Sequence, residues 1–135
     1  MLECSRVTVF VLRLSHRPGE LARLCTQLRQ VDVEMVGMWG PIIGRASVGF
    51  HCIPESPDQF RSFVRDAEMP ATEFGAFLIN DKSNGGSFVS RLDSIAGAGI
   101  NIEAIQSLTI DGSLSAVIWV NGADEDRLIQ ILNKA

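Results

Sequence analysis

The sequence predicts an α+β fold of two repeats, each ordered strand, helix, strand, strand, helix, with antiparallel sheets and helices on one face. Two observations predict it. Short apolar runs rich in β-branched residues alternate with segments whose apolar residues recur at helical spacing, and glycine and proline separate them. The chain also repeats its own pattern at an offset of 67 residues (86 − 19), which pairs Gly19 with Gly86 and Leu28 with Ile95.

The first repeat begins with a strand over residues 6–14 that is apolar on both faces and rich in valine. A helix over residues 18–30 follows, and proline suits its first turn because the missing N–H has no helical partner there. Its buried stripe is predicted to be Leu21, Leu24, Cys25 and Leu28. Strands over residues 33–39 and 45–53 come next, joined by a turn with glycine and proline.

The motif "SPDQF" predicts the start of the second helix of the first repeat. Ser56 is placed to cap this helix, Pro57 to be its first residue, and Gln59 to complete a capping box. The second repeat has a strand over residues 73–79, a helix over 87–98, a strand entered at "GINIEAI", a strand over 113–120 and a helix over 124–134. Phe60 falls on Arg127 at the repeat offset, and the apolar register slips by one to Leu128.

The repeats divide the chain into residues 1–69 and 70–135, two units with a small volume for their surface. A complete unit needs one more strand, and neither repeat has an obvious one of its own. "EMPATEFGAFLIN" has room for one strand. An edge left unpaired is expected to join the other unit or another chain, which predicts association, with a homodimer as the simplest form.

Composition narrows the class of protein. The chain has 135 residues, 46% of them hydrophobic, and a net charge of −4 with scattered Lys and Arg, which argues against nucleic acid or an anionic membrane as partner. The odd set of Cys4, Cys25 and Cys52 has no paired spacing and indicates reduced thiols and a cytoplasmic protein. "VTVFVLRL" is too short to span a bilayer.

Two stretches, "HRPGELARLCTQLRQVDVEM" and "NDKSNGGSFVSRLDSIAGAGINIEAI", resemble a tandem pair of ACT domains, ferredoxin-like regulatory modules that commonly bind amino acids. The resemblance covers nearly the whole chain. The family pattern has a polar residue, often Asp or Asn, three residues before the glycine of a Pro-Gly pair. An apolar helix face and a "G-x-N-I" entry to the next strand follow. The first repeat has His16 at the polar position and Glu34 where Asn is common, whereas the second lacks the proline. The resemblance implies that ligands lie where two units meet.

The residues of these stretches suit an amino-acid ligand. Glycine lets a ligand approach the backbone, and the first amides of a helix attract a carboxylate because they lack partners and carry partial positive charge. Polar side chains nearby would accept hydrogen bonds from the ammonium group. The candidate ligand-binding residues are His16, Pro18, Gly19, Glu34, Asn80, Asp81, Asn84, Gly85, Gly86, Asn101 and Ile102.

Each candidate also has a simpler interpretation. Gly19 and Gly86 suit plain strand-to-helix turns, Asn101 is placed to hydrogen-bond its own turn, Asp81 is an ordinary loop residue, and His16 an ordinary solvated histidine. These simpler readings stay open at the level of sequence.

Other classes of protein are less well supported. The two histidines, His16 and His51, form no recognisable motif with a nucleophile, so no enzyme is expected. The loop "SHRPGE" lacks the paired thiols of a metal carrier, and no metal or cofactor is expected. An RNA-recognition module needs aromatic and basic residues on its central strands, where "RASVGFHCI" offers only Phe50.

The sequence therefore predicts a non-catalytic regulatory module that binds a small molecule, a free amino acid, at a glycine loop, a helix start and the interface between units. With no catalytic domain in the sequence, its target would be a separate protein or its own assembly. The alternative is an interaction or assembly module with the same fold and no small-molecule ligand.

Overall fold

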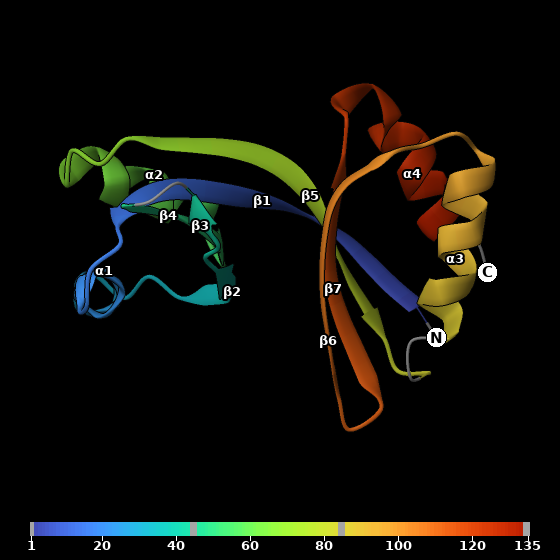
Figure 1. The fold of residues 1–135 in the computed structure, drawn as a ribbon, viewed down its shortest axis with the longest axis horizontal. Helices are drawn as coiled ribbons and strands as arrows, with labels where there is room; N and C mark the ends of the chain where they lie inside the picture. Colours follow the sequence, from blue (N-terminus) through green and yellow to red (C-terminus); the bar gives the residue numbers. More distant parts are fainter. Residues whose placement is uncertain (1, 44–45, 84–85, 134–135) are drawn as a thin grey trace. The chain divides into compact units, whose positions relative to one another are not determined.

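The computed structural model describes residues 2–43, 46–83 and 86–133, and Figure 1 shows its elements. The chain forms two compact units. One is continuous in sequence, Thr8–Phe74, and is called the continuous unit below. The other joins Met1–Val7 to Gly75–Ala135 and is called the split unit. This division differs from a single boundary between residues 69 and 70, because the first seven residues belong with the second repeat.

The continuous unit contains most of the strand β1 (Leu2–Ser15), followed by the helix and strands of the first repeat. These elements are α1 (Glu20–Gln30), β2 (Met35–Trp39), β3 (Ile42–Ile43), β4 (Ser47–Pro54) and α2 (Pro57–Asp66). Strand β4 lies between β1 and β2 and runs antiparallel to both, with Leu12 opposite Phe50 and Met38 opposite Cys52.

Both helices of the continuous unit share one core with the sheet. Phe10 of β1 and Phe50 of β4 are buried together with Leu24 of α1 and Phe60 of α2. The rings of Phe10 and Phe60 lie 4.7 Å apart between centroids. Because even-numbered residues of β1 and β4 face this core, α1 and α2 cover the same face of the sheet.

The split unit repeats this plan. Its elements are β5 (Ala71–Asp81), α3 (Gly86–Gly97), β6 (Ile102–Ile110), β7 (Ser113–Val120), a short 3₁₀ turn (Gly122–Asp124) and α4 (Glu125–Leu132). Strand β7 lies between β5 and β6, antiparallel to both. Figure 1 shows α3 and α4 beside each other on one side of β6 and β7, and their core includes Phe77, Phe88, Ile118 and Leu128.

Two long strands supply what each repeat lacks. β1 and β5 are neighbours in the hydrogen-bonded strand order, and each has residues in both units. The start of β1 belongs to the split unit, where Arg6 pairs with Glu125 of α4 at 2.8 Å. The start of β5 belongs to the continuous unit, where Glu73 pairs with Arg61 of α2 at 2.8 Å. Each sheet is thus completed by part of a strand that continues into the other unit.

The predicted cap of the second helix is present in part. Ser56 Oγ accepts a hydrogen bond from the Gln59 backbone N–H at 3.3 Å, and Pro57 is the first helical residue. The Gln59 side chain donates instead to the carbonyls of Val31 and Asp32, so it ties α2 to the end of α1. No helix in the described part of the chain is long and apolar enough to cross a membrane.

Candidate functional site

The start of α1 in the continuous unit is open. β1 ends at Ser15, and a turn leads to Gly19, whose φ of 87° is a left-handed conformation that glycine adopts without strain. The first helical bond runs from the Arg23 N–H to the Gly19 carbonyl. The amides of Leu21 and Ala22 lie in the first turn, where the helix itself offers no acceptor, and no side chain caps this start. They lie at the positive end of the helix dipole.

The start of α3 in the split unit is closed by its own chain. Asp81, the last residue of β5, is fully buried. One of its carboxylate oxygens accepts from the Ser83 backbone N–H at 2.9 Å and from the Ser83 hydroxyl, and the other accepts from the Phe88 N–H at 2.9 Å. Burial raises the pKa of Asp81, but the hydrogen bonds from Ser83 and Phe88 outweigh it and hold the pKa below its ordinary value.

The difference between the two helix starts comes from a pair of matched positions. At the repeat offset, the counterpart of Asp81 is Leu14 (81 − 67), which packs against the core of the continuous unit. An aliphatic side chain cannot accept from helix amides. The first repeat therefore leaves open the anion-binding position that the second repeat fills with a carboxylate.

A cavity of about 310 Å³ lies at the open start, wholly within the continuous unit. This volume is at the lower end of the range of roughly 300–1,000 Å³ for small-molecule sites, as a ligand of amino-acid size requires. The residues that line it are Leu14, Ser15, His16, Arg17, Glu20, Leu21, Met38, Trp39, Gly40, Val48 and Phe50.

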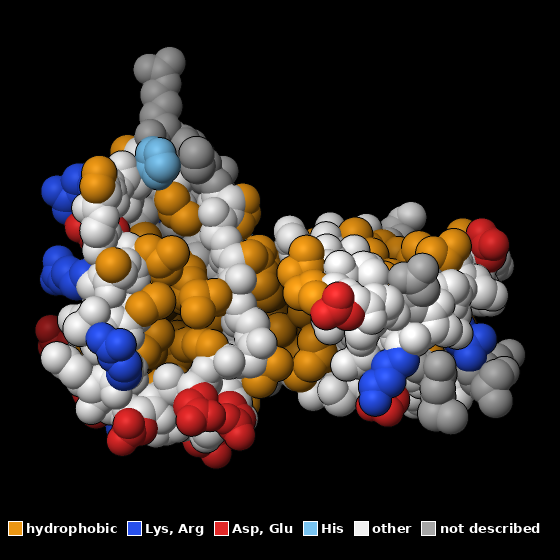
Figure 2. Space-filling model, turned by 90° about the horizontal axis from the view of Figure 1, so that it is seen from below, with side chains coloured by type: hydrophobic (Ala, Val, Ile, Leu, Met, Phe, Trp, Pro, Cys, Tyr) orange, Lys and Arg blue, Asp and Glu red, His pale blue; other side chains and the backbone are white. Residues whose placement is uncertain are grey.

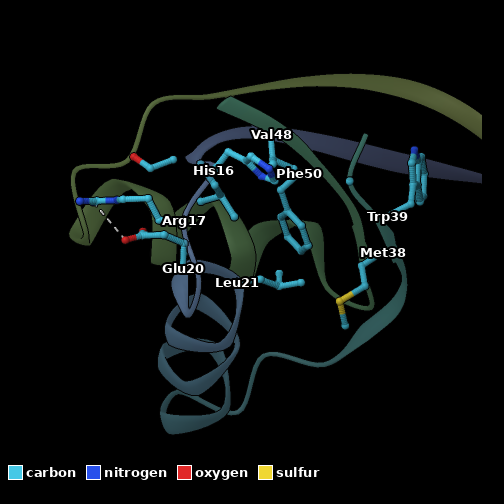
Figure 3. Close-up of a pocket in the computed structure, with 11 residues that line it drawn as sticks. His16, Arg17, Glu20, Leu21, Met38, Trp39, Val48 and Phe50 are labelled. Carbon is cyan, nitrogen blue, oxygen red and sulfur yellow. Dashed lines mark hydrogen bonds and ion pairs between the residues drawn. The ribbon is translucent and has the colours of Figure 1, made fainter. Parts of the chain in front are cut away.

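Figure 3 shows how these side chains are arranged. Arg17 and Glu20 lie together at one side, joined by an ion pair of 3.2 Å between guanidinium and carboxylate. Phe50 reaches from β4 towards Leu21 of α1, and Met38 of β2 lies beyond them. The cavity therefore has a polar end beside the helix start and an apolar end formed by the sheet and α1.

The ring of Trp39 points away from this apolar end (Figure 3). It stacks on His51 of β4, with ring centroids 5.3 Å apart and an angle of 19° between the planes. His51 also places Nδ1 2.7 Å from the Gly49 carbonyl. Trp39 therefore packs against a residue of the neighbouring strand.

Of the candidates in the first repeat, His16 lines the cavity. Pro18 and Gly19 form the turn before α1 but do not line it. Glu34 lies at a second cavity, near the far end of α1, together with Cys25. There a hydrogen bond with the Glu55 carboxyl raises the pKa of Glu34. The structure thus places Glu34 and His16 at different cavities, although Met38 lines both.

The candidates in the second repeat lie in the split unit. Asn80 Oδ1 accepts from the Ser113 hydroxyl at 3.2 Å, and Asn101 is exposed just before β6. Gly86 begins α3, and Ile102 begins β6 and packs against the core. Asn84 and Gly85 lie outside the described residues.

Sequence reasoning missed the apolar end of the cavity. The sequence predicts Leu21 in the buried stripe of its helix, whereas Leu21 is 48% exposed, and Met38 of β2 is 49% exposed. Only Leu24 and Leu28 of α1 are fully buried among the described residues. Leu21 follows the turn glycine by two residues, so it lies in the first helical turn, next to any ligand at the helix start. This spacing could have identified Leu21 as a cavity residue.

Among the described residues, no group of three or more His, Cys, Asp and Glu side chains is gathered as a metal site would require. A scan against models of protein families finds no match for the sequence, and a search of curated proteins finds none either.

Solved structures share the fold over nearly the whole chain. Protein BT0572 from Bacteroides thetaiotaomicron matches with a TM-score of 0.82 and 16% identity, over 96% of this chain and 88% of that one. The ligand-free regulatory subunit of aspartate kinase from Thermus thermophilus matches with a TM-score of 0.65 and 11% identity, over 97% of this chain and 93% of that one.

A third structure, E. coli aspartokinase III in complex with lysine and aspartate, matches with a TM-score of 0.58 and 16% identity, over 97% of this chain and 31% of that one. At these identities the likeness concerns the fold. The predicted fold is confirmed: the chain has the tandem ACT-like α+β fold of aspartate kinase regulatory subunits.

Proposed function

We propose that this chain is a non-catalytic regulatory module that binds a free amino acid in the cavity at the start of α1. The observation that carries the proposal is the contrast between the two repeats. The α3 start is filled by the buried carboxylate of Asp81, whereas the matching α1 start is uncapped and borders a cavity of about 310 Å³.

The polar end of this cavity suits the two charged groups of an amino acid. The α1 amides and the Arg17 guanidinium are donors for a carboxylate, and the Glu20 carboxylate is an acceptor for an ammonium group. A ligand that takes one partner each from Arg17 and Glu20 would replace their mutual ion pair. Since that pair lies at the surface, separating its members costs little.

Regulation would follow from differential binding. A ligand shifts an arrangement of the module only if it binds that arrangement better than the alternative. The module would act on a separate target protein or on its own assembly. The aspartokinase III structure that shares this fold is in complex with lysine and aspartate, which supports the proposal by analogy of fold.

Thermal unfolding with each of the twenty amino acids at millimolar concentration tests the proposal. A ligand at a hundred times its dissociation constant adds about 2.7 kcal/mol to the free energy of unfolding, which raises Tm by on the order of 5–10 °C. The variant Arg17→Ala should lose most of that shift. Arg23→Ala is the matched control, because Arg23 is an exposed arginine of α1 that does not line the cavity. No shift with any amino acid would contradict the proposal.

One observation favours the alternative function, assembly without a ligand. β6 is the last strand in its sheet order, and three large apolar residues are exposed on it: Ile105, Leu108 and Ile110. An uncovered apolar edge strand is a surface for pairing with another chain, which for a homodimer is a second copy. Sedimentation of the wild type and of Leu108→Lys tests this reading, because the charge should shift a dimer towards monomer.

A further inference from the structure

The apolar end of the cavity identifies a chemical class of ligand, an inference that rests on the proposed function of the same site. Five apolar side chains form this end: Leu14, Leu21, Met38, Val48 and Phe50. They come from three strands and one helix, so the apolar surface is concave and not a chance neighbour of the helix start.

Leu21 and Met38 are the informative members of this set. Both are large and apolar, yet nearly half of each residue is exposed, and both border this cavity. Met38 also lines the second cavity, whereas Leu21 lines only this one. Figure 2 shows apolar side chains exposed on the unit that holds α1, α2 and β2, with charged side chains around them. A ligand that covers apolar surface inside a cavity removes this surface from water, which makes its binding more favourable.

Charge at the cavity leads to the same conclusion. Among the described lining residues, the charged side chains other than histidine are Arg17 and Glu20, both at the polar end. The α-carboxylate and α-ammonium groups of a ligand would occupy these partners. A second charge on the ligand side chain would then lie against Leu21, Met38 and Phe50 without a partner, which is unfavourable.

We infer that the ligand of this cavity is an α-amino acid with a large apolar side chain, of the leucine, methionine or phenylalanine kind. Covering a leucine-sized side chain makes such a ligand bind about tenfold to a hundredfold more tightly than alanine. Lysine, aspartate and glycine bind more weakly than leucine at this site.

Isothermal titration calorimetry with leucine, methionine, phenylalanine, alanine, lysine and aspartate tests the inference on the full chain. The expected result is measurable binding of the first three and a dissociation constant for alanine at least tenfold higher. Met38→Glu should weaken leucine binding at least tenfold. Val36→Glu is the matched control, because Val36 lies on the same strand, is 52% exposed and does not line the cavity.

The outcomes separate the two proposals. If lysine or aspartate binds more tightly than leucine, the inferred class is wrong while the amino-acid-binding function stands. If no amino acid binds, both fail. If Met38→Glu and Val36→Glu weaken leucine binding equally, or if Leu21→Gln, at a residue that lines only this cavity, leaves leucine binding unchanged, the ligand is not in this cavity. Should Met38→Glu fail to fold, Leu21→Gln at the opposite wall takes its place, with the same tenfold loss expected.

Discussion

The carboxylate of Asp81 offers the sharpest test of how the split unit is held together. Replacing it by alanine removes the acceptor for the Phe88 N–H, the Ser83 N–H and the Ser83 hydroxyl. Loss of a helix cap costs about 1 kcal/mol, and a buried donor left without a partner costs about 1–3 kcal/mol. We expect Asp81→Ala to lower the free energy of unfolding by about 2–4 kcal/mol, measured by urea unfolding at pH 7.

The pH dependence gives a second readout of the same residue. The pKa of Asp81 is lower in the folded protein than its ordinary value, about 3.9 in an unfolded chain. Its stabilising contribution is therefore complete above that value and is lost as the pH falls through the folded-state pKa. Asp81→Asn, which cannot ionise, should be less stable than wild type at pH 6 and should lose less stability between pH 6 and pH 3.

Ser56→Ala is the control for both measurements. Ser56 caps α2 with a neutral hydroxyl at an exposed position, so its loss costs about 1 kcal/mol and leaves the acid dependence unchanged. The reasoning is refuted if Asp81→Ala costs no more than Ser56→Ala. It is also refuted if Asp81→Asn keeps the full acid dependence of the wild type.

Two further predictions compare matched positions of the repeats by urea unfolding. Gly19→Ala should lower the free energy of unfolding by about 1–2 kcal/mol because the backbone there is left-handed. Gly86→Ala should leave it unchanged or raise it by up to about 1 kcal/mol, because the added Cβ would meet nothing within 4 Å. Equal effects of the two substitutions would contradict this. Phe60→Ala should cost about 3–5 kcal/mol and Leu128→Ala about 2–5 kcal/mol, because both side chains are fully buried. A loss under 1 kcal/mol in either variant would contradict the matched register.

Much of the fold was predictable because it depends on apolar spacing. The repeat at an offset of 67 residues, the strand and helix order and the one-residue slip between Phe60 and Leu128 all reappear in the two cores. Ser56 and Pro57 lie where local capping chemistry requires them. Such features depend on residues close together in the chain, so they can be predicted from the sequence alone.

The completion of each sheet was not predictable in the same way. The sequence predicted strands over residues 6–14 and 73–79, whereas β1 spans Leu2–Ser15 and β5 spans Ala71–Asp81. The residues added to β1 alternate Leu2 and Cys4, which pack against the core of the split unit, with exposed Glu3 and Ser5. This run is too short to show from spacing alone that it continues the strand. Its extended form depends on pairing with distant segments, and pairing between distant segments leaves little trace in local spacing.

The candidate site shows the same limit more clearly, because Leu14 and Asp81 occupy equivalent strand ends. Leu14 is partly buried against the core of the continuous unit, and Asp81 is buried with its carboxylate on the Phe88 N–H of α3. A pattern of spacing treats Asp81 as an exposed loop residue that is free for a ligand, although the fold commits its carboxylate to the α3 amides. Asp81, one of the candidate ligand-binding residues, thus closes its own helix start. The leucine at the matching position, which has no polar chemistry, leaves the α1 start open, and so we place the ligand in the first repeat.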